Sequence, residues 1–454
     1  MKSLILLSLL YGTQLFSNAL TLQDAIELIK NNNLEVKVAT LDEKISHIDS
    51  DILTSKNFGV LEFTQDYANS NDAGNVFGFK LSSREATFGD FGAEEFMNAV
   101  GANGGIPPQS AYTTPPNNLN YPTAQNYFKS KLSYEVPLYT GGKLSSYQKI
   151  THAVSKIKQL DKTAMINEKL YQTKKSFYDM ALLQNSLQKI TTLEANIVML
   201  KEITKNMIDE GYAKKIDLLE VESKEANIVR IKNQLHSNEK LLYQFLSFLL
   251  NRKVNSIEVP QSDIVYQHKS TNLENSIDIQ KAKAGLEIFT QKKEVANSSY
   301  FPVIGARAEV ATADDTFLGD AVDHASYTVG AQLKWNLFNG GADSANSEKS
   351  QVEYLKMKTQ LELAKAGISL QVQKIKTEIQ SFQYETESLS KELVLQNEIL
   401  QNYQGRYKEK LVSMSDVIIK HSELLATVLE LLSVKNSLNE RAIALEKILT
   451  PQYK

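Results

Sequence analysis

Two short segments of the sequence resemble each other: Leu138-Tyr139-Thr140-Gly141-Gly142 and Leu337-Phe338-Asn339-Gly340-Gly341, offset by 199 residues. Asp217 and Asp416 have the same offset, and each follows the second glycine of its pair by 75 residues. A fixed offset over separate features indicates an internal duplication. We therefore expect one unit to occur twice, in the order helix, strand, loop, strand, Gly-Gly, long helix, break and long helix.

The residues before each Gly-Gly pair alternate between apolar and polar side chains, which is typical of a β-strand with one apolar face. Segments 128–138 and 327–337 present the same apolar face when 199 is added to the residue number. Weaker alternation at 61–67 and 304–310 supplies a partner strand for each, so the second strand pair is expected within 303–338. Strands of about 10 residues with one apolar face suit the wall of an outer-membrane barrel. A half-buried soluble sheet has the same pattern.

Aromatic residues stand at one end of the predicted strands. Outer-membrane barrels carry a girdle of aromatic side chains at each membrane interface. The residues that we assign to such a girdle are Tyr139, Trp335 and Phe338.

The segments after the Gly-Gly pairs are predicted to be very long helices. From Lys143 to about Asp209 there is no proline or glycine, and Ala342 to Gln404 contains only Gly367. The breaks at 210–212 and 407–413 turn each helix back into a hairpin, at 143–250 and at 342–449. Apolar residues at every seventh position indicate coiled-coil packing of these hairpins: Val221, Ile228, Leu235, Leu242 and Leu249, then Val417, Leu424, Leu431, Leu438 and Leu445.

The two repeats are expected to occupy residues 20–259 and 260–454, each beginning with a helix. The first carries about 44 extra residues before its Gly-Gly pair, in a segment, 68–126, that is rich in Gly, Asn and Pro. We expect this segment to be an exposed loop, in which residues 76–81 extend the neighbouring strand.

The N-terminal residues 1–19 have the pattern of a secretory signal peptide. Lys2 precedes an apolar stretch from Leu4 to Leu10, and Ser17-Asn18-Ala19 fits a cleavage site after small residues. The alternative is a buried first helix. With a signal peptide, the periplasm, the outer membrane and the exterior are the possible destinations.

The composition argues against several classes of function. The net charge is −3, from 50 basic and 53 acidic residues, so no basic surplus favours nucleic acid. Without cysteine, thiolate metal sites and cysteine nucleophiles are excluded. No two of the six histidines lie within five residues of each other, and no complete nucleotide-binding or hydrolase motif is present. We expect no enzyme, no cofactor and no metal site.

The chain resembles the TolC-family outer-membrane efflux proteins over essentially its whole mature length. The residues that carry the resemblance are Leu20-Thr21-Leu22-x-x-Ala25-Ile26 with Lys30-Asn31-Asn32, the two Gly-Gly turns, and the breaks that end in Asp217 and Asp416. Asn33 stands where proline is usual, and Val412 where some members carry an arginine of the entrance lock. The valine at position 412 puts the entrance lock in doubt, but it does not affect the expected fold.

The resemblance implies a mixed α and β membrane protein. Three chains form a homotrimer, each giving four strands to a shared 12-stranded β-barrel, with a helical tunnel in the periplasm. It also implies a periplasmic adaptor protein and an inner-membrane pump or ABC ATPase as partners. Physical reasoning agrees on oligomerisation, because four strands cannot close a barrel and open edges in lipid leave backbone groups unpaired.

The function expected is therefore an outer-membrane channel-tunnel for efflux or type I secretion, with drug efflux and protein secretion left open. The alternative is a periplasmic coiled-coil scaffold that does not insert into the membrane.

The two breaks contain the expected site residues. We assign adaptor docking to Gly211, Tyr212, Lys410 and Leu411, although Gly211 has the simpler role of a turn residue as its alternative. Because Lys410 replaces Gly211 in the second copy, the two tips should differ.

The expected periplasmic gate consists of Asp217 and Asp416, with Lys410 and, from the resemblance, Tyr407. In a trimer the two aspartates supply six carboxylates around one axis, and Asp rings of this kind favour cations. Lysines near the breaks could pair with them across chains. The alternative is that each aspartate caps the returning helix. The glycines Gly141, Gly142, Gly340 and Gly341 are assigned to the strand-to-helix junctions.

Overall fold

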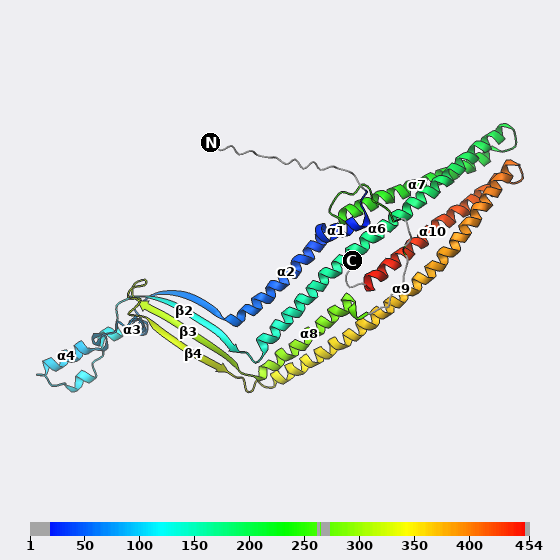
Figure 1. Cartoon of the computed structure of the whole chain (residues 1–454). Helices are drawn as coiled ribbons and strands as arrows, with labels where there is room; N and C mark the ends of the chain where they lie inside the picture. Colours follow the sequence, from blue (N-terminus) through cyan, green and yellow to red (C-terminus); the bar gives the residue numbers. More distant parts are fainter. Residues whose placement is uncertain (1–18, 261–263, 265–272, 450–454) are drawn as a thin grey trace, which may run out of the picture. The chain divides into compact units, whose positions relative to one another are not determined.

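A computed structural model of the chain describes residues 19–260, 264 and 273–449 (Figure 1). The predicted signal peptide, apart from Ala19, lies outside the described residues, as do residues 261–263 and 265–272. In the described part the order of helix, two strands, long helix and second helix occurs twice, as the duplication predicts.

The first run of elements, which corresponds to the first repeat, contains an additional segment between its two strands. The first run is α1 (Leu22–Asn32), α2 (Leu34–Ser55), β1 (Val60–Ser70), α3 (Ala73–Ser82), α4 (Ala93–Ala102), α5 (Asn117–Asn120), β2 (Gln125–Tyr139), α6 (Lys143–Asp209) and α7 (Lys215–Leu249). The second run is α8 (Ile277–Asn297), β3 (Val303–Asp314), β4 (Ser326–Lys334), α9 (Ala342–Lys408) and α10 (Met414–Leu449).

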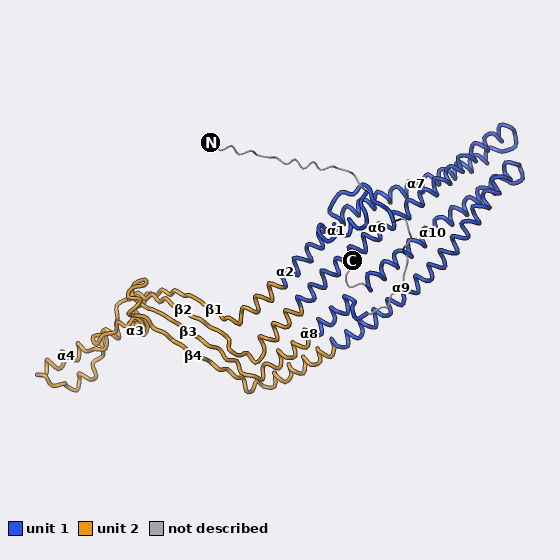
Figure 2. The backbone as a smooth tube through the Cα atoms, in the orientation of Figure 1, with its two compact units in different colours: residues 1–46, 154–286, 357–454 blue, residues 47–153, 287–356 orange. Residues whose placement is uncertain are grey.

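The chain divides into two compact units, coloured separately in Figure 2. The first, here called the helical unit, contains the described residues of 1–46, 154–286 and 357–454. The second, the sheet unit, contains residues 47–153 and 287–356, with all four strands. Each unit draws on both repeats, so neither repeat is a separate folding domain.

The four strands form one antiparallel sheet in the order β1-β2-β3-β4, as their alternating sequences predict. The register places Leu61, Tyr134, Ala308 and Val329 opposite one another in a row across the sheet. The neighbouring row consists of Phe63, Leu132, Val310 and Tyr327. Most of these side chains are exposed in the single chain, Val329 by 74% and Tyr327 by 82%.

The opposite face of the sheet carries the charges. The register pairs Asp66 with Lys129 and Glu135 with Arg307, whose Nε lies 3.6 Å from a Glu135 carboxylate oxygen. The sheet therefore has one apolar face and one polar face, and its outer strands β1 and β4 each leave one edge unpaired among the described residues.

The heptad positions form the core of the helical unit. One apolar cluster joins α6, α7, α9 and α10: its fully buried members include Ile190, Ile197, Val221, Ile228 and Val417. Because a single cluster contains residues of both hairpins, the hairpins pack against each other as the sevenfold spacing predicts. None of the helices in the described part of the chain has the length and hydropathy that crossing a membrane requires.

The segment between β1 and β2 corrects two predictions. Residues 76–81 were expected to extend a strand, but they lie in α3, whose first turn is capped because Asp72 accepts a hydrogen bond from the backbone N–H of Asn75 at 3.0 Å. Residues 68–126 were expected to be a loop, but β1 extends to Ser70, β2 begins at Gln125, and α3, α4 and α5 lie between them. We call residues 71–124 the insert.

The end of the second strand pair also differs from its prediction. The strand expected over 327–337 ends at Lys334, so Trp335 and Phe338 lie just beyond it. The Trp335 indole N–H donates a hydrogen bond to the Tyr300 carbonyl at 3.1 Å, which ties this segment to the residues just before β3. In the first repeat β2 does reach Tyr139, through an irregularity at Pro137.

Candidate functional site

The two hairpins end in turns with the same backbone conformation. The first tip, residues 210–214, joins α6 to α7, and the second tip, residues 409–413, joins α9 to α10. Gly211 has φ +81°, and Lys410, its equivalent, has φ +65°. The Gly211 N–H bonds to the Ile208 carbonyl and the Lys410 N–H to the Tyr407 carbonyl, both at 2.9 Å. The prediction that the tips differ is therefore wrong for the backbone.

Lys410 holds a conformation that is unfavourable for a residue with a side chain, at a cost of about 1–2 kcal/mol. Its Nζ lies 3.0 Å from the centre of the Tyr212 ring on the first tip. A cation over an aromatic face contributes about 0.5–1 kcal/mol at an exposed site. The lysine thus links the two tips while it strains its own turn. Ser415 makes a second link between the hairpins, donating to a Glu220 carboxylate oxygen at 2.8 Å.

Asp217 and Asp416 both cap the helix that follows their tip. Asp217 Oδ2 accepts a hydrogen bond from the Lys214 N–H at 2.7 Å, and Asp416 Oδ2 accepts one from the Ser413 N–H at 3.0 Å. The Ser413 hydroxyl also donates to Asp416 Oδ2 at 2.6 Å, and together these bonds lower the pKa of Asp416. The capping role is thus present in both repeats. The gating role stays a prediction.

Tyr407 lies inside the apolar cluster that joins the hairpins. Its side chain is 5% exposed, and its hydroxyl donates to Thr204 Oγ1 on α6 at 3.5 Å. Burial raises the pKa of this phenol. Within the described residues no ion pair joins Lys214, Lys215, Lys408 or Lys410 to either aspartate of the same chain.

The exposed residues at the tips are those available to a partner. Tyr212 is 63% and Leu411 62% exposed, and both follow directly the residue with positive φ. Two of the four residues assigned to adaptor docking therefore present large apolar surfaces to solvent.

The junction glycines lie where the strands give way to helices, and all four have positive φ: Gly141, Gly142, Gly340 and Gly341. A side chain at Gly141 would also meet the Ser298 carbonyl oxygen at 2.8 Å. The aromatics assigned to the membrane interface, Tyr139, Trp335 and Phe338, are all exposed in the single chain.

His421 is a buried residue for which sequence reasoning indicated no more than a packing or surface role. It lies on α10 within the hairpin core, fully shielded from solvent. Its Nε2 is 3.3 Å from the Leu193 carbonyl oxygen, and its Nδ1 has no hydrogen-bond partner. Burial, assisted by the nearby Lys224, lowers the pKa of His421 to about 4. In the sequence, the only indication that His421 is buried was its position between the heptad residues Val417 and Leu424.

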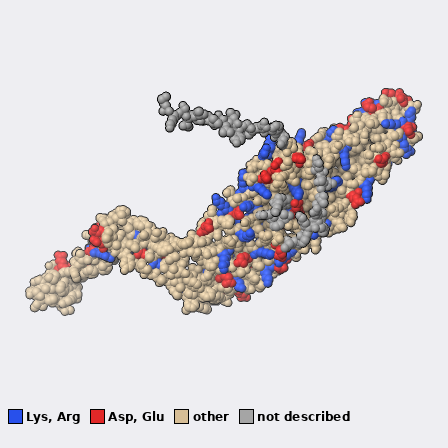
Figure 3. Space-filling model, in the orientation of Figure 1, with Lys and Arg blue, Asp and Glu red and all other residues tan. Residues whose placement is uncertain are grey.

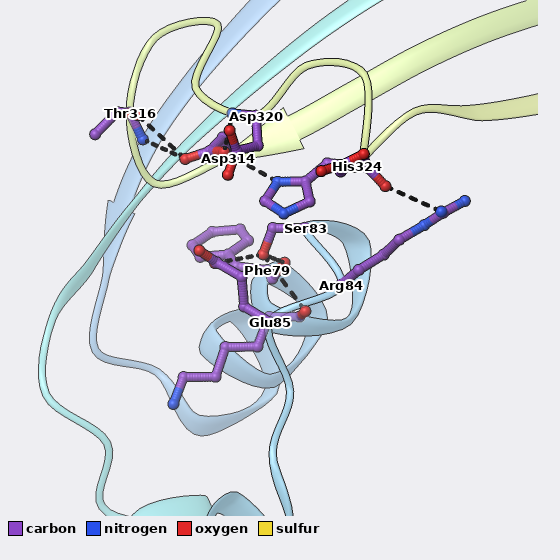
Figure 4. Close-up of polar contacts among 10 residues, drawn as sticks. Phe79, Ser83, Arg84, Glu85, Asp314, Thr316, Asp320 and His324 are labelled. Atoms are coloured by element: carbon purple, nitrogen blue, oxygen red, sulfur yellow. Dashed lines mark hydrogen bonds and ion pairs between the residues drawn. The ribbon is translucent and has the colours of Figure 1, made fainter.

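A carboxylate cluster lies at the end of the sheet next to the insert, and Figure 4 shows its surroundings. Glu85, Asp314 and Asp315 have oxygens within 4.8 Å of one another, the one group in the described residues with a spacing suited to a metal ion. Asp314 is already bonded to the N–H groups of Thr316 and Asp320, both at 3.0 Å, and its Oδ2 is 2.9 Å from His324 Nδ1. We interpret the cluster as part of the contact between the insert and the sheet.

We expect Gly211→Ala to loosen the first tip, because the new Cβ has space but the left-handed backbone becomes strained by about 1–2 kcal/mol. Hydrogen–deuterium exchange of the turn amides should accelerate about 5- to 30-fold. Glu210→Ala, one residue earlier, is the control and should leave exchange nearly unchanged. Equal exchange in the two variants would contradict the strain at this position.

We expect His421 to make stability depend on pH. Its folded pKa of about 4 lies below the free value of 6.5, so the unfolded chain binds the proton more readily. The contribution of His421 to the free energy of unfolding is complete above pH 6.5. It falls by about 3 kcal/mol at most as the pH decreases from 6.5 to 4. Melting curves across this range should show a weaker pH dependence for His421→Gln, whereas the exposed His236→Gln should melt like the parent protein.

The comparisons with known proteins agree with this arrangement. Residues 270–450 match the model of the family described as outer membrane efflux protein. No curated protein matches the sequence.

Solved structures share the fold over nearly the whole chain. The structure of CusC has 14% identity and a TM-score of 0.77, covering 96% of this chain and 95% of CusC. VceC of Vibrio cholerae has 14% identity and a TM-score of 0.75, covering 94% of each chain. CmeC of Campylobacter jejuni has 12% identity and a TM-score of 0.75, covering 95% of this chain and 86% of CmeC.

These likenesses confirm the predicted fold class. Residues 270–450 are therefore similar to the outer membrane efflux protein family, and the chain as a whole has the fold seen in the structures of CusC, VceC and CmeC.

Proposed function

We propose that three copies of this chain form one channel, through which substrates pass from a periplasmic adaptor and an inner-membrane pump to the cell exterior. The observation that carries the proposal is the sheet of the single chain. Its edges β1 and β4 are unpaired, and its apolar face is exposed over both central rows. Edge pairing between chains satisfies the backbone groups of both edges and closes the wall.

The two faces of the sheet then have different surroundings. The apolar rows that include Leu132 and Val329 contact lipid, and the face with Lys129, Glu135 and Arg307 lines the water-filled interior. The aromatic residues Tyr139, Trp335 and Phe338 lie at the membrane interface, where their amphipathic rings are stable.

The tips are the proposed docking site for the adaptor. Tyr212 and Leu411 offer exposed apolar side chains, and Gly211 and Lys410 shape the turns that present them. The chain carries no nucleotide-binding motif, so we assign the driving energy to a pump or ABC ATPase reached through the adaptor. The proposal includes no catalytic role for this chain.

Asp217 and Asp416 are the proposed charged ring of the periplasmic gate. Each uses Oδ2 for its cap, which leaves Oδ1 available to ions. Six carboxylates around one axis favour cations and attract divalent ions, which should block the channel. Tyr407 and Lys410 support this region from the second hairpin, through the Thr204 and Tyr212 contacts.

The oligomer and its location are tested together by fractionating membranes and measuring the mass of the detergent-extracted protein. A heat-sensitive trimer in outer membranes is expected. A soluble periplasmic monomer would instead support the alternative, a coiled-coil scaffold.

We expect Asp217→Asn with Asp416→Asn to abolish cation preference and divalent block in planar bilayers, because the ring loses its charge. Ser413→Ala is the matched control: it removes the two hydrogen bonds that the Ser413 hydroxyl makes with Asp416 but keeps the carboxylate. It should lower stability only. If the double variant keeps its selectivity and only its stability falls, the aspartates are caps and the selectivity arises elsewhere.

We expect Val329→Lys and Thr328→Lys to have opposite outcomes, since these neighbours in β4 lie on opposite faces of the sheet and both are exposed in the chain. A lysine facing lipid near the bilayer centre costs about 2–4 kcal/mol, whereas one facing the interior costs little. The amount of heat-sensitive trimer in the outer membrane should fall for Val329→Lys alone. Equal loss for both would contradict the assignment of the faces.

A further inference from the structure

The insert is fastened to the end of the sheet at several points, which Figure 4 shows in part. The Arg84 guanidinium donates to the carbonyls of Asp323 at 3.0 Å and Ala325 at 2.6 Å, in the connection between β3 and β4. The Phe79 ring stacks on Tyr127 of β2, with 4.2 Å between ring centres. The base of the insert is therefore held by both strand pairs of the chain.

The charged residues of the insert all lie within 72–95, in its first half. Lys80 pairs with Asp90, whose pKa it lowers to about 2, and Arg84 and Glu85 contact the sheet end. From Phe96 to Phe128, however, 33 consecutive residues contain no Asp, Glu, Lys or Arg. At the 23% charged content of the chain, such a stretch would carry about 8 charges. Figure 3 shows an acidic patch at this end of the molecule, beside a larger surface without charged atoms, and the first turn of α4 carries Glu94 and Glu95.

Large apolar side chains are exposed on this uncharged part of the insert. Met97 is 65%, Ile106 69%, Tyr112 66% and Tyr121 80% exposed in the single chain. Amide and hydroxyl side chains such as Asn103 and Thr113 lie between them in the sequence. Exposed aromatic and apolar groups among uncharged polar ones are typical of the centre of a protein interface.

We propose that the uncharged parts of three inserts contact one another and form a lid over the outer mouth of the channel. This inference rests on the trimer proposed above, in which threefold symmetry places one insert on each third of the barrel rim. Identical side chains meet where copies approach the axis, so charges there would repel. A charge-free surface is what this self-contact requires.

A lipid surface fits the uncharged part of the insert less well than a second copy of the chain does. The outer face of a membrane is contacted through basic residues when its lipids are anionic, and residues 96–128 contain none. The amide side chains of this stretch would also lose their water in hydrocarbon without gaining partners. A second copy of the same surface supplies both apolar contact and hydrogen-bonding groups.

The chain has no cysteine, so single cysteines report contacts between copies without background. Oxidising the full-length trimer with Ile106→Cys, or separately with Tyr121→Cys, should join two of its three chains by a disulfide. Leu132→Cys, on the lipid-facing side of β2, is the control and should stay unlinked. On intact cells a water-soluble and a lipid-soluble maleimide should both label the Ile106→Cys variant slowly.

A charge at the contact should open the lid. We expect Ile106→Lys to raise single-channel conductance at least twofold, because three like charges repel at the axis. Ile106→Asn removes the same apolar side chain without adding charge and should have the smaller effect.

The other possible results of these experiments would contradict the proposal of a lid. Trimers that form no disulfide at either position and have unchanged conductance in Ile106→Lys would exclude it while leaving the channel proposal intact. Fast labelling of the Ile106→Cys variant by the lipid-soluble reagent alone would assign the surface to lipid. A protein that is monomeric throughout would refute the trimer itself, and with it the lid.

Discussion

The four-stranded sheet imposes the constraint on which the rest of the molecule depends. Its central rows are apolar and exposed, and both of its edges lack partners in the part of the chain that the structure describes. A sheet in lipid must satisfy every edge group, which one chain with four strands cannot do. The long hairpins, the junction glycines and the insert are all attached to these strands, so in the proposed trimer each is repeated three times.

Duplication preserved backbone geometry more strictly than side-chain chemistry. Lys410 adopts the left-handed conformation that Gly211 adopts without strain, and the same hydrogen bonds close both turns. Ser413 adds a hydroxyl to the cap of α10, whereas its equivalent Lys214 gives α7 only a backbone N–H. The shape of the tips is common to both repeats, and their surfaces are free to differ.

Sequence patterns predicted the elements whose own periodicity decides their structure. The sevenfold spacing from Val221 to Leu249 and the alternation before each Gly-Gly pair located the hairpins and strands to within a few residues. The insert was predicted wrongly because its glycines and asparagines obscured a helix that the Asp72 cap and the packing of α3 against the sheet stabilise. The Lys410–Tyr212 contact and the burial of His421 and Tyr407 arise from packing between hairpins, which no local pattern records.

The two roles assigned to Asp416 support each other. Six carboxylates placed close together raise one another's pKa, which would weaken a charged ring by favouring protonation. The Ser413 hydroxyl and N–H act in the opposite direction, since they lower the pKa of Asp416 by bonding to its ionised form. The cap therefore keeps the carboxylate charged under conditions in which an uncapped ring would begin to take up protons. The helix cap at Asp416 is therefore compatible with the proposed carboxylate gate.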